Sequence, residues 1–444
     1  MNVALPDTVF GTIDSGNTAW VIASAGLVLL MTPALAFFYG GLTRAKSVLN
    51  MMMMSFGALG VVTVIYVLWG FSMSFGNSLT GSKDILGIFS NPFELFGSDQ
   101  LMQSKEVGGT TQVVVWGDYG IPAIVFLAFQ LTFAVITVAL ISGAIAERVK
   151  FTTWLVFSGL FATIVYFPLA HMVWGGGILS GAEDGIAAKM FGVTDSAATV
   201  APIDFAGGTV VHINAGMAGL VLALIVGKRK GFGKTAYRPH NIPFVMLGAA
   251  LLWFGWFGFN AGSELGADAT AGLVWVNTTV ATAAAMIGWL LVEWFRDGHA
   301  TSVGAASGIV AGLVAITPAC AALTPIGSIA LGLVAGALAA VAIGLKYKFG
   351  FDDSLDVVGV HLVAGLWGTI GIGLLAKDTG LFYGNGFKQI AVQTVVALVA
   401  LLFTAVLTAV IGYALKPLGW RVDDEAEFVG IDSAEHAESA YETT

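Results

Sequence analysis

Two stretches of the sequence decide the fold, VHINAGMAG at 211–219 and VHLVAGLWG at 360–368. Both follow the pattern VHxxAGxxG inside long apolar segments, and the pattern places His212 and His361 149 residues apart. An imidazole in hydrocarbon is costly and marks a functional site by default. Because the histidine recurs, we expect that two halves of the chain build one site within the membrane.

The composition lies far outside that of soluble globular proteins. Of 444 residues, 57% are hydrophobic and 11% are charged, with a mean hydropathy of +0.86. These values indicate an all-α polytopic membrane protein. The single cysteine, Cys320, excludes an internal disulfide and a cysteine-rich metal or iron–sulfur site.

Eleven apolar stretches are long enough to cross about 30 Å of hydrocarbon. We therefore predict eleven transmembrane helices, near residues 18–40, 47–75, 121–146, 151–172, 205–227, 241–263, 271–296, 302–321, 325–347, 357–376 and 387–415. The loops at 76–120 and 173–204 are long and are expected to cover or border an outer vestibule.

The positive charges of the loops give an orientation. With the N-terminus outside, fourteen of the 19 Lys and Arg residues fall on the inner side, as cytoplasmic loops require. This N-out/C-in arrangement needs an odd number of spans. His212 then lies on the fifth span and His361 on the tenth, which predicts a five-plus-five inverted repeat.

The repeat divides the chain into parts. The transmembrane domain is expected to cover 1–415, with a first half at about 18–227, a second half at about 241–376, and a peripheral eleventh helix at about 387–415. Residues 416–444 hold eight acidic and two basic residues, so we expect an acidic cytoplasmic tail. By its composition alone that tail would be solvated.

Aromatic residues gather in two spans. Phe129 and Phe133 are spaced i, i+4 and share one helix face, and several rings crowd the sixth span between Trp253 and Phe259. An aromatic wall beside a polar group such as Ser263 can hold a small cation through its ring faces.

A set of motifs resembles the ammonium transporter family in order along the chain. They are FQLTF at 129–133, ER at 147–148, HMVWGGG at 171–177, DFAGGTVVHIN at 204–214, GKR at 227–229, WFGFNAGS at 256–263 and DVVGVH at 356–361. The resemblance implies a homotrimer in the cell membrane, with a narrow hydrophobic pore in each subunit.

The resemblance also implies roles for individual residues. Ammonium recruitment is assigned to Trp174, Ser263 and Phe129, a pore gate of stacked rings to Phe129 and Phe259, the pore-lining twin histidines to His212 and His361, and support of the outer site to Asp204 and Trp256. It implies a PII-type nitrogen regulator as a partner at the cytoplasmic face, and residues 419–425 resemble the family's regulatory segment. No cofactor, metal or nucleic acid is expected.

The chemistry of the substrate agrees with these roles. Bare ammonium cannot cross hydrocarbon cheaply, because ring contacts return little of its lost hydration free energy. Neutral ammonia can pass, and neutral imidazoles can both donate and accept hydrogen bonds. We expect that ammonium is recruited, loses a proton near Phe129 and Phe259, and crosses as ammonia while the histidines relay the proton. Methylammonium is the expected analogue.

Other interpretations remain open at this point. The histidines could only join helices by hydrogen bonds or bind a metal or haem, although no carboxylate or cysteine partners lie nearby. Asp204 could simply cap the fifth span. The chain could instead be an ammonium sensor with residual transport, or a cation-coupled transporter for a larger amine.

Overall fold

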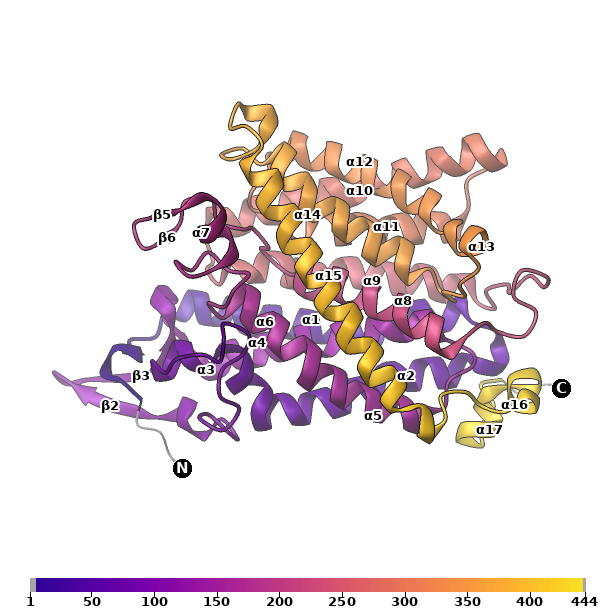
Figure 1. The fold of residues 1–444 in the computed structure, drawn as a ribbon, viewed down its shortest axis with the longest axis horizontal. Helices are drawn as coiled ribbons and strands as arrows, with labels where there is room; N and C mark the ends of the chain where they lie inside the picture. Colours follow the sequence, from indigo (N-terminus) through magenta and orange to yellow (C-terminus); the bar gives the residue numbers. More distant parts are fainter. Residues whose placement is uncertain (1–4, 442–444) are drawn as a thin grey trace.

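Long helices make up most of the molecule (Figure 1). The computed structural model describes residues 5–441. Within this range ten helical segments are long and apolar enough to cross a membrane, and a further apolar helix, Ser302–Ile316, is shorter. The predicted all-α polytopic membrane fold is thereby confirmed, and this shorter helix lies where the span near 302–321 was expected.

The main helices follow the expected order along the chain. They are α1 (Ser15–Leu42), α2 (Val48–Ile65), α3 (Phe71–Thr80), α4 (Ala123–Ile141), α5 (Phe151–Phe161), α6 (Phe167–Trp174), α8 (Asn214–Val226), α9 (Ile242–Ala261), α10 (Ala269–Asp297), α11 (Ser302–Ile316), α12 (Pro325–Ala342), α14 (Ala364–Leu375) and α15 (Lys388–Ala414). Short helices α7 (Ile186–Phe191), α13 (Leu345–Phe349), α16 (Asp424–Val429) and α17 (Ile431–His436) lie in the connections and the tail.

Four spans contain a wider, π-helical turn. Two of these turns join α2 to α3 and α5 to α6, at Tyr66–Gly70 and Ala162–Tyr166. The other two, Gly208–Ile213 and Val358–Val363, open the spans of α8 and α14 and carry the two repeated histidines. Turns of this kind are rare and are frequent at functional sites.

Side-chain caps explain where several helices begin. The side chains of Asp14, Asp268, Thr301 and Thr324 each accept a backbone N–H from the first turn of α1, α10, α11 and α12. Each cap satisfies a donor that has no partner within its helix.

Part of the long loop at 76–120 joins residues near the N-terminus and residues just before α4 in a small antiparallel sheet. Its strands are β1 (Phe10–Gly11), β2 (Ser104–Val107), β3 (Thr110–Trp116) and β4 (Ile121–Pro122); β1 and β2 pair with β3, and β4 also pairs with β3. Gly108 and Gly109 both have positive φ, at 62° and 83°, as a two-residue hairpin turn requires. A second pair, β5 (Val193–Thr194) and β6 (Ala197–Ala198), lies in the loop at 173–204.

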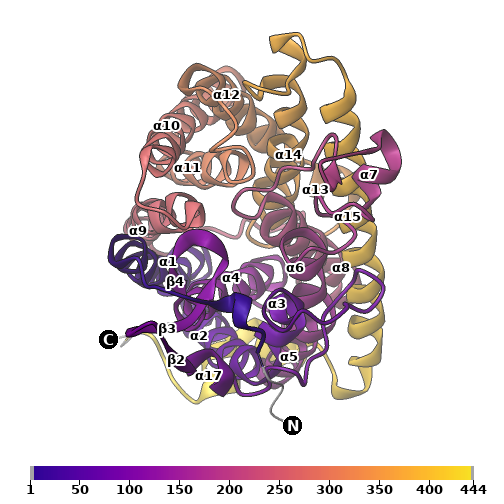
Figure 2. The same cartoon turned by 90° about the vertical axis from the view of Figure 1, so that its left-hand side faces the viewer.

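The hairpin β2–β3 and the tail helices α16 and α17 lie at opposite ends of the bundle (Figure 1). We call the hairpin end the outer side and the tail end the inner side. Seen from the outer side, α15 runs along one edge of the bundle (Figure 2). Its residues Leu402, Val406 and Val410 are exposed, which gives this helix an apolar outward face suited to lipid.

Candidate functional site

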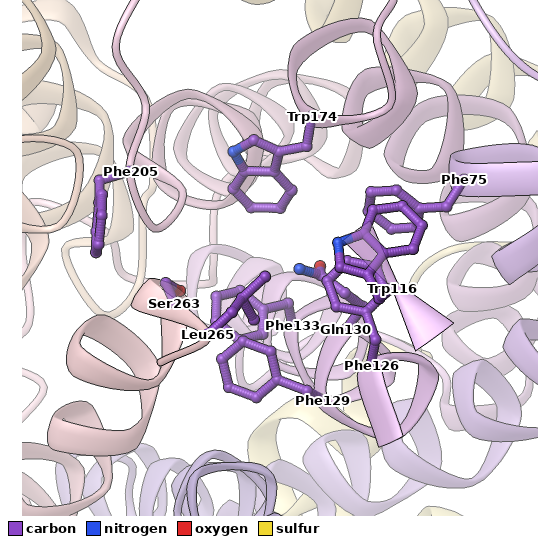
Figure 3. A pocket seen from close by; sticks show the side chains of 10 residues that line it. All are labelled: Phe75, Trp116, Phe126, Phe129, Gln130, Phe133, Trp174, Phe205, Ser263 and Leu265. Atoms are coloured by element: carbon purple, nitrogen blue, oxygen red, sulfur yellow. The ribbon is translucent and has the colours of Figure 1, made fainter. Parts of the chain in front are cut away.

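A cavity of about 140 Å³ opens on the outer side of the bundle (Figure 3). The loops and helices around it contribute mostly aromatic rings. Its lining residues are Phe75, Trp116, Phe126, Phe129, Gln130, Phe133, Trp174, Phe205, Ser263 and Leu265. The structure thus brings together Trp174, Ser263 and Phe129, the three residues expected to recruit ammonium. We call this cavity the outer pocket.

Polar atoms in the outer pocket are few. The Ser263 hydroxyl donates to the Phe259 carbonyl over 2.8 Å, so its oxygen keeps acceptor capacity for a ligand. The Gln130 amide also lines the pocket. A small cation here would meet ring faces and a few oxygens, which suits an ammonium ion.

Asp204 does not line the outer pocket but bonds Trp174, which does. Its carboxylate accepts the N–H groups of Gly207, Gly208, Thr209 and Val210 over 2.6–3.1 Å. Its carbonyl accepts the Trp174 indole N–H over 2.8 Å. Asp204 therefore caps the span that carries His212 through its side chain and bonds the Trp174 indole through its backbone carbonyl.

The stacked ring pair below the pocket is formed by Phe133 and Phe259. Their centroids are 4.1 Å apart and their planes differ by 16°. The expected pairing of Phe129 with Phe259 is wrong, because Phe129 lies one helical turn nearer the outer side and meets Phe133 edge-on at 4.9 Å. The i, i+4 spacing of Phe129 and Phe133 predicts that both rings lie on one helix face, but it does not show which of them lies level with Phe259.

Beneath the ring pair lies a second, narrow cavity of about 10 Å³. His212 and His361 line it, together with Phe259, Trp256 and apolar side chains. A space of this size holds about one water-sized molecule. Phe133 lines the outer pocket and Phe259 lines this histidine cavity, so the ring pair separates the two.

The two repeated histidines meet directly. His361 Nδ1 lies 3.3 Å from His212 Nδ1, and the exposed fractions of the two residues are 2% and 1%. Trp256 stacks on His212 with centroids 5.4 Å apart, and its indole N–H donates to the Thr317 hydroxyl over 2.8 Å. Trp256 therefore belongs to the histidine cavity, and its expected place beside the outer site is corrected.

The glycines of the repeated pattern let the two histidine spans cross closely. A Cβ on Gly216 would lie 2.5 Å from the Leu362 backbone nitrogen, and a Cβ on Gly365 would lie 3.2 Å from His212 Cβ. Arg229, just after α8, bonds Asp352, just before the span of α14. The two spans therefore run antiparallel, as an inverted repeat requires.

The repeat also includes an aspartate. Asp353 precedes His361 by the same eight residues that separate Asp204 from His212, and its carboxylate accepts the N–H groups of Val357 and Val358. Burial, with a smaller contribution from Asp356, raises the pKa of Asp353 to about 6. Asp356, two residues before the π-helical turn, instead pairs with Lys346 over 2.6 Å.

The inner side carries a buried ion-pair network. Arg229 bonds both Glu147 and Asp352, at 2.9 and 2.8 Å, and Arg44 bonds Glu147 at 3.1 Å. Burial alone would raise the pKa of Glu147, but Arg229 and Arg44 lower it overall. The network ties the loops after α1, α4 and α8 to the segment before α14 beneath the histidine cavity.

Within residues 5–441 no three His, Cys, Asp or Glu side chains lie together as a possible group of metal ligands. His171, also on the outer side, is fully buried. Its Nε2 lies 3.1 Å from the Asp84 carboxylate and its Nδ1 lies 3.1 Å from the Ser74 carbonyl. His171 thus holds the loop after α3 against α6.

The sequence as a whole matches known proteins. The model of the Ammonium Transporter Family covers residues 19–441. The chain belongs to the ammonium transporter family. A Mycobacterium tuberculosis ammonium transporter is 54% identical over 98% of this chain and 92% of its own length, and a Bacillus subtilis ammonium transporter is 42% identical over 96% and 98%.

Solved structures of the family share the fold. A protein named Sensor Amt Protein superposes with a TM-score of 0.80 at 28% identity, over 95% of this chain and 98% of its own. Saccharomyces cerevisiae Mep2 superposes with a TM-score of 0.79 at 30% identity, over 93% and 89%. The membership predicted from the motifs is confirmed.

Proposed function

We propose that this transporter recruits ammonium in the outer pocket and conducts ammonia past His212 and His361. The observation that carries the proposal is the order of the parts along one line. An aromatic pocket with a free serine oxygen comes first, then the stacked rings of Phe133 and Phe259, then a water-sized cavity at two buried histidines. A narrow, mostly apolar path of this kind suits ammonia and excludes its hydrated ion.

The histidine pair supplies the polar contacts within this path. Because the two Nδ1 atoms face each other, one imidazole donates and the other accepts. His212 Nε2 is buried and has no hydrogen-bond partner within residues 5–441. It is free to bond a molecule in the cavity, which supports a role in orienting ammonia.

The proton is proposed to travel separately along the same pair, so that net transport carries charge. Deprotonation is placed at the ring pair, where the ion leaves the pocket that stabilises it. An imidazole pair that shares one hydrogen can pass a proton by exchanging donor and acceptor roles. Methylammonium, which adds one methyl group, is the proposed substrate analogue.

The setting of the pore is also proposed. The chain acts as a homotrimer in the cell membrane with its N-terminus outside, and fourteen positive residues on the inner side support this orientation. The membrane domain covers 1–415 and the tail begins at 416. A PII-type regulator is the proposed partner of the inner face, and no cofactor or nucleic acid is required.

A sensor role is the second candidate, since one structural relative is named Sensor Amt Protein. The test is ammonium uptake and charge movement in proteoliposomes, with wild type compared to His212→Ala plus His361→Ala. We expect uptake and current in the wild type and loss of both in the double variant. Specific ammonium binding without uptake would favour the sensor, and unchanged flux and current in the double variant would refute the role of the pair.

A further inference from the structure

Trp116 closes one side of the outer pocket and comes from outside the helical bundle. It is the last residue of β3, in the hairpin that the loop at 76–120 forms. In Figure 3 its indole lies on the side of the pocket opposite Phe205 and Ser263. The outer pocket is therefore completed by a residue from outside the helical bundle.

Trp116 is held rigidly at this position. Its ring stacks on Phe126 with centroids 3.9 Å apart and planes within 8°, and it meets Phe75 edge-on at 5.5 Å. Its backbone pairs with Ile121 across β3 and β4, directly before α4. A side chain fixed by a strand pair and a ring stack acts as a wall and not as a mobile lid.

Behind this wall lies a larger space. A cavity of about 340 Å³ adjoins the outer pocket and is lined by Thr8, Val9, Ser78, Leu79, Val115, Trp116, Gly117 and Asp118. Trp116 is the residue that lines both this side cavity and the outer pocket. Trp116 thus lies between a pocket of about 140 Å³ and a space more than twice as large.

We infer that Trp116 is the specificity-determining wall of the outer pocket, which admits ammonium and methylammonium and rejects larger alkylammonium ions. One face of the ring is covered by Phe126, so Trp116 acts through its bulk and its edge. By keeping the side cavity's water out, it also strengthens the contacts of a cation with the remaining rings, which weaken when hydrated. The inference rests on the proposed recruitment of ammonium in this pocket.

The test uses full-length protein in proteoliposomes and measures methylammonium uptake in competition with tetramethylammonium. Trp116→Ala joins the two cavities, so we expect the KM for methylammonium to rise about five- to tenfold. Tetramethylammonium should become a stronger competitor, with an inhibition constant about tenfold lower than in the wild type. For Trp116→Phe, the KM for methylammonium and the inhibition constant of tetramethylammonium should lie between those of the wild type and of Trp116→Ala. The matched control is Val107→Ala on the same hairpin, an exposed side chain that lines neither cavity.

A cysteine variant separates loss of the wall from loss of folding. The natural Cys320 is buried, so Trp116→Cys provides the one accessible thiol. Benzyl methanethiosulfonate should attach an aromatic ring there and restore rejection of tetramethylammonium, whereas methyl methanethiosulfonate should not. Unchanged KM and competition in a folded Trp116→Ala protein, or no restoration by the benzyl reagent, would overturn the inference. Absence of uptake by the wild type would instead overturn the proposed function.

Discussion

His212 Nδ1 and His361 Nδ1 lie 3.3 Å apart, although 149 residues separate them in the chain. Only one hydrogen fits between two facing nitrogens, so the protonation of one ring fixes the role of the other. The pair is therefore one unit built from two halves of the chain. Gly216 and Gly365 permit this contact, because a side chain at either position would push the two spans apart.

Such a unit predicts that single and double substitutions are not additive. We expect His212→Ala and His361→Ala each to reduce the ammonium-induced current at least about tenfold, and the double variant to reduce it little further. The measurement is a solid-supported membrane current at matched protein amounts, with thermal unfolding as the control for folding. Additive losses in the logarithm of the current would show that the two rings act separately.

Phe133 and Phe129 are predicted to have different functions despite their spacing. Phe133→Ala breaks the stack with Phe259 and joins the outer pocket to the histidine cavity, so water permeability of the vesicles should rise. Phe129→Ala leaves the stack in place and should mainly raise the KM for methylammonium, by about three- to tenfold through loss of one ring contact. Stopped-flow light scattering and uptake kinetics measure the two effects. The assignment fails if Phe129→Ala opens the water path and Phe133→Ala does not.

The parts of the site that the sequence predicted well are those fixed by a long-range repeat. His212 and His361 were paired by one shared pattern, and each lies in the span where it was expected. No such repeat shows how far along the pore a side chain lies. Phe129 and Phe133 share a face, so only the packing of α4 against α9 decides which ring meets Phe259.

Two further positions escaped prediction for a related reason. Trp256 lies one turn from Phe259, and its contact with His212 depends on the crossing of two distant spans. Trp116 lies in a loop whose strands are too short and too near Gly residues for the sequence to place its side chain. The tail shows the limit of composition: its acidity predicts a solvated segment, yet Asp432 is buried and bonds the start of α2.

From the hydrogen bonds of Asp204 we predict that removal of its charge lowers both the stability of the protein and its affinity for methylammonium. Asp204→Asn replaces one of the two acceptor oxygens by an amide nitrogen, which cannot accept the two N–H groups of the helix start that bonded that oxygen. We expect a destabilisation of about 1–3 kcal/mol. We also expect a raised KM for methylammonium, because the Asp204 backbone carbonyl that holds the Trp174 indole shifts when its side chain loses these bonds. Thermal unfolding and uptake measure these effects. As a matched control, Asp195→Asn in the same outer loop changes an exposed carboxylate and should leave both values unchanged.

The contact between the tail and α2 predicts local release of the tail. Asp432 accepts the N–H groups of Leu49 and Asn50 over 3.0 and 2.8 Å. Asp432→Ala removes a cap worth about 1 kcal/mol, so hydrogen exchange in 424–441 should become faster while exchange in α8 and α14 stays the same. Glu438→Ala, at an exposed position without an ion pair in the described part of the chain, is the control. Equal exchange in wild type and Asp432→Ala would show that other contacts hold the tail.

The Arg229 network predicts a pH-dependent stability. Burial acts to raise the pKa values of Glu147 and Asp352, but the neighbouring arginines lower both overall. A carboxylate whose pKa is lower in the folded state stabilises the fold at any pH above its pKa in the unfolded state. That unfolded-state pKa is about 4.3 for Glu and 3.9 for Asp. That contribution is lost as the pH falls through the folded values.

Arg229→Ala leaves Glu147 and Asp352, with side chains 1% and 0% exposed, without their main partner. We expect a destabilisation of about 3–5 kcal/mol at pH 7. The deficit should shrink as the pH is lowered, because the orphaned carboxylates take up protons at a higher pH than in the wild type. Thermal unfolding in detergent from pH 7 to pH 4 measures it, with the exposed Lys234→Ala as control. A deficit that is constant or grows on acidification would mean that Arg229 stabilises the inner side through packing and not through its ion pairs.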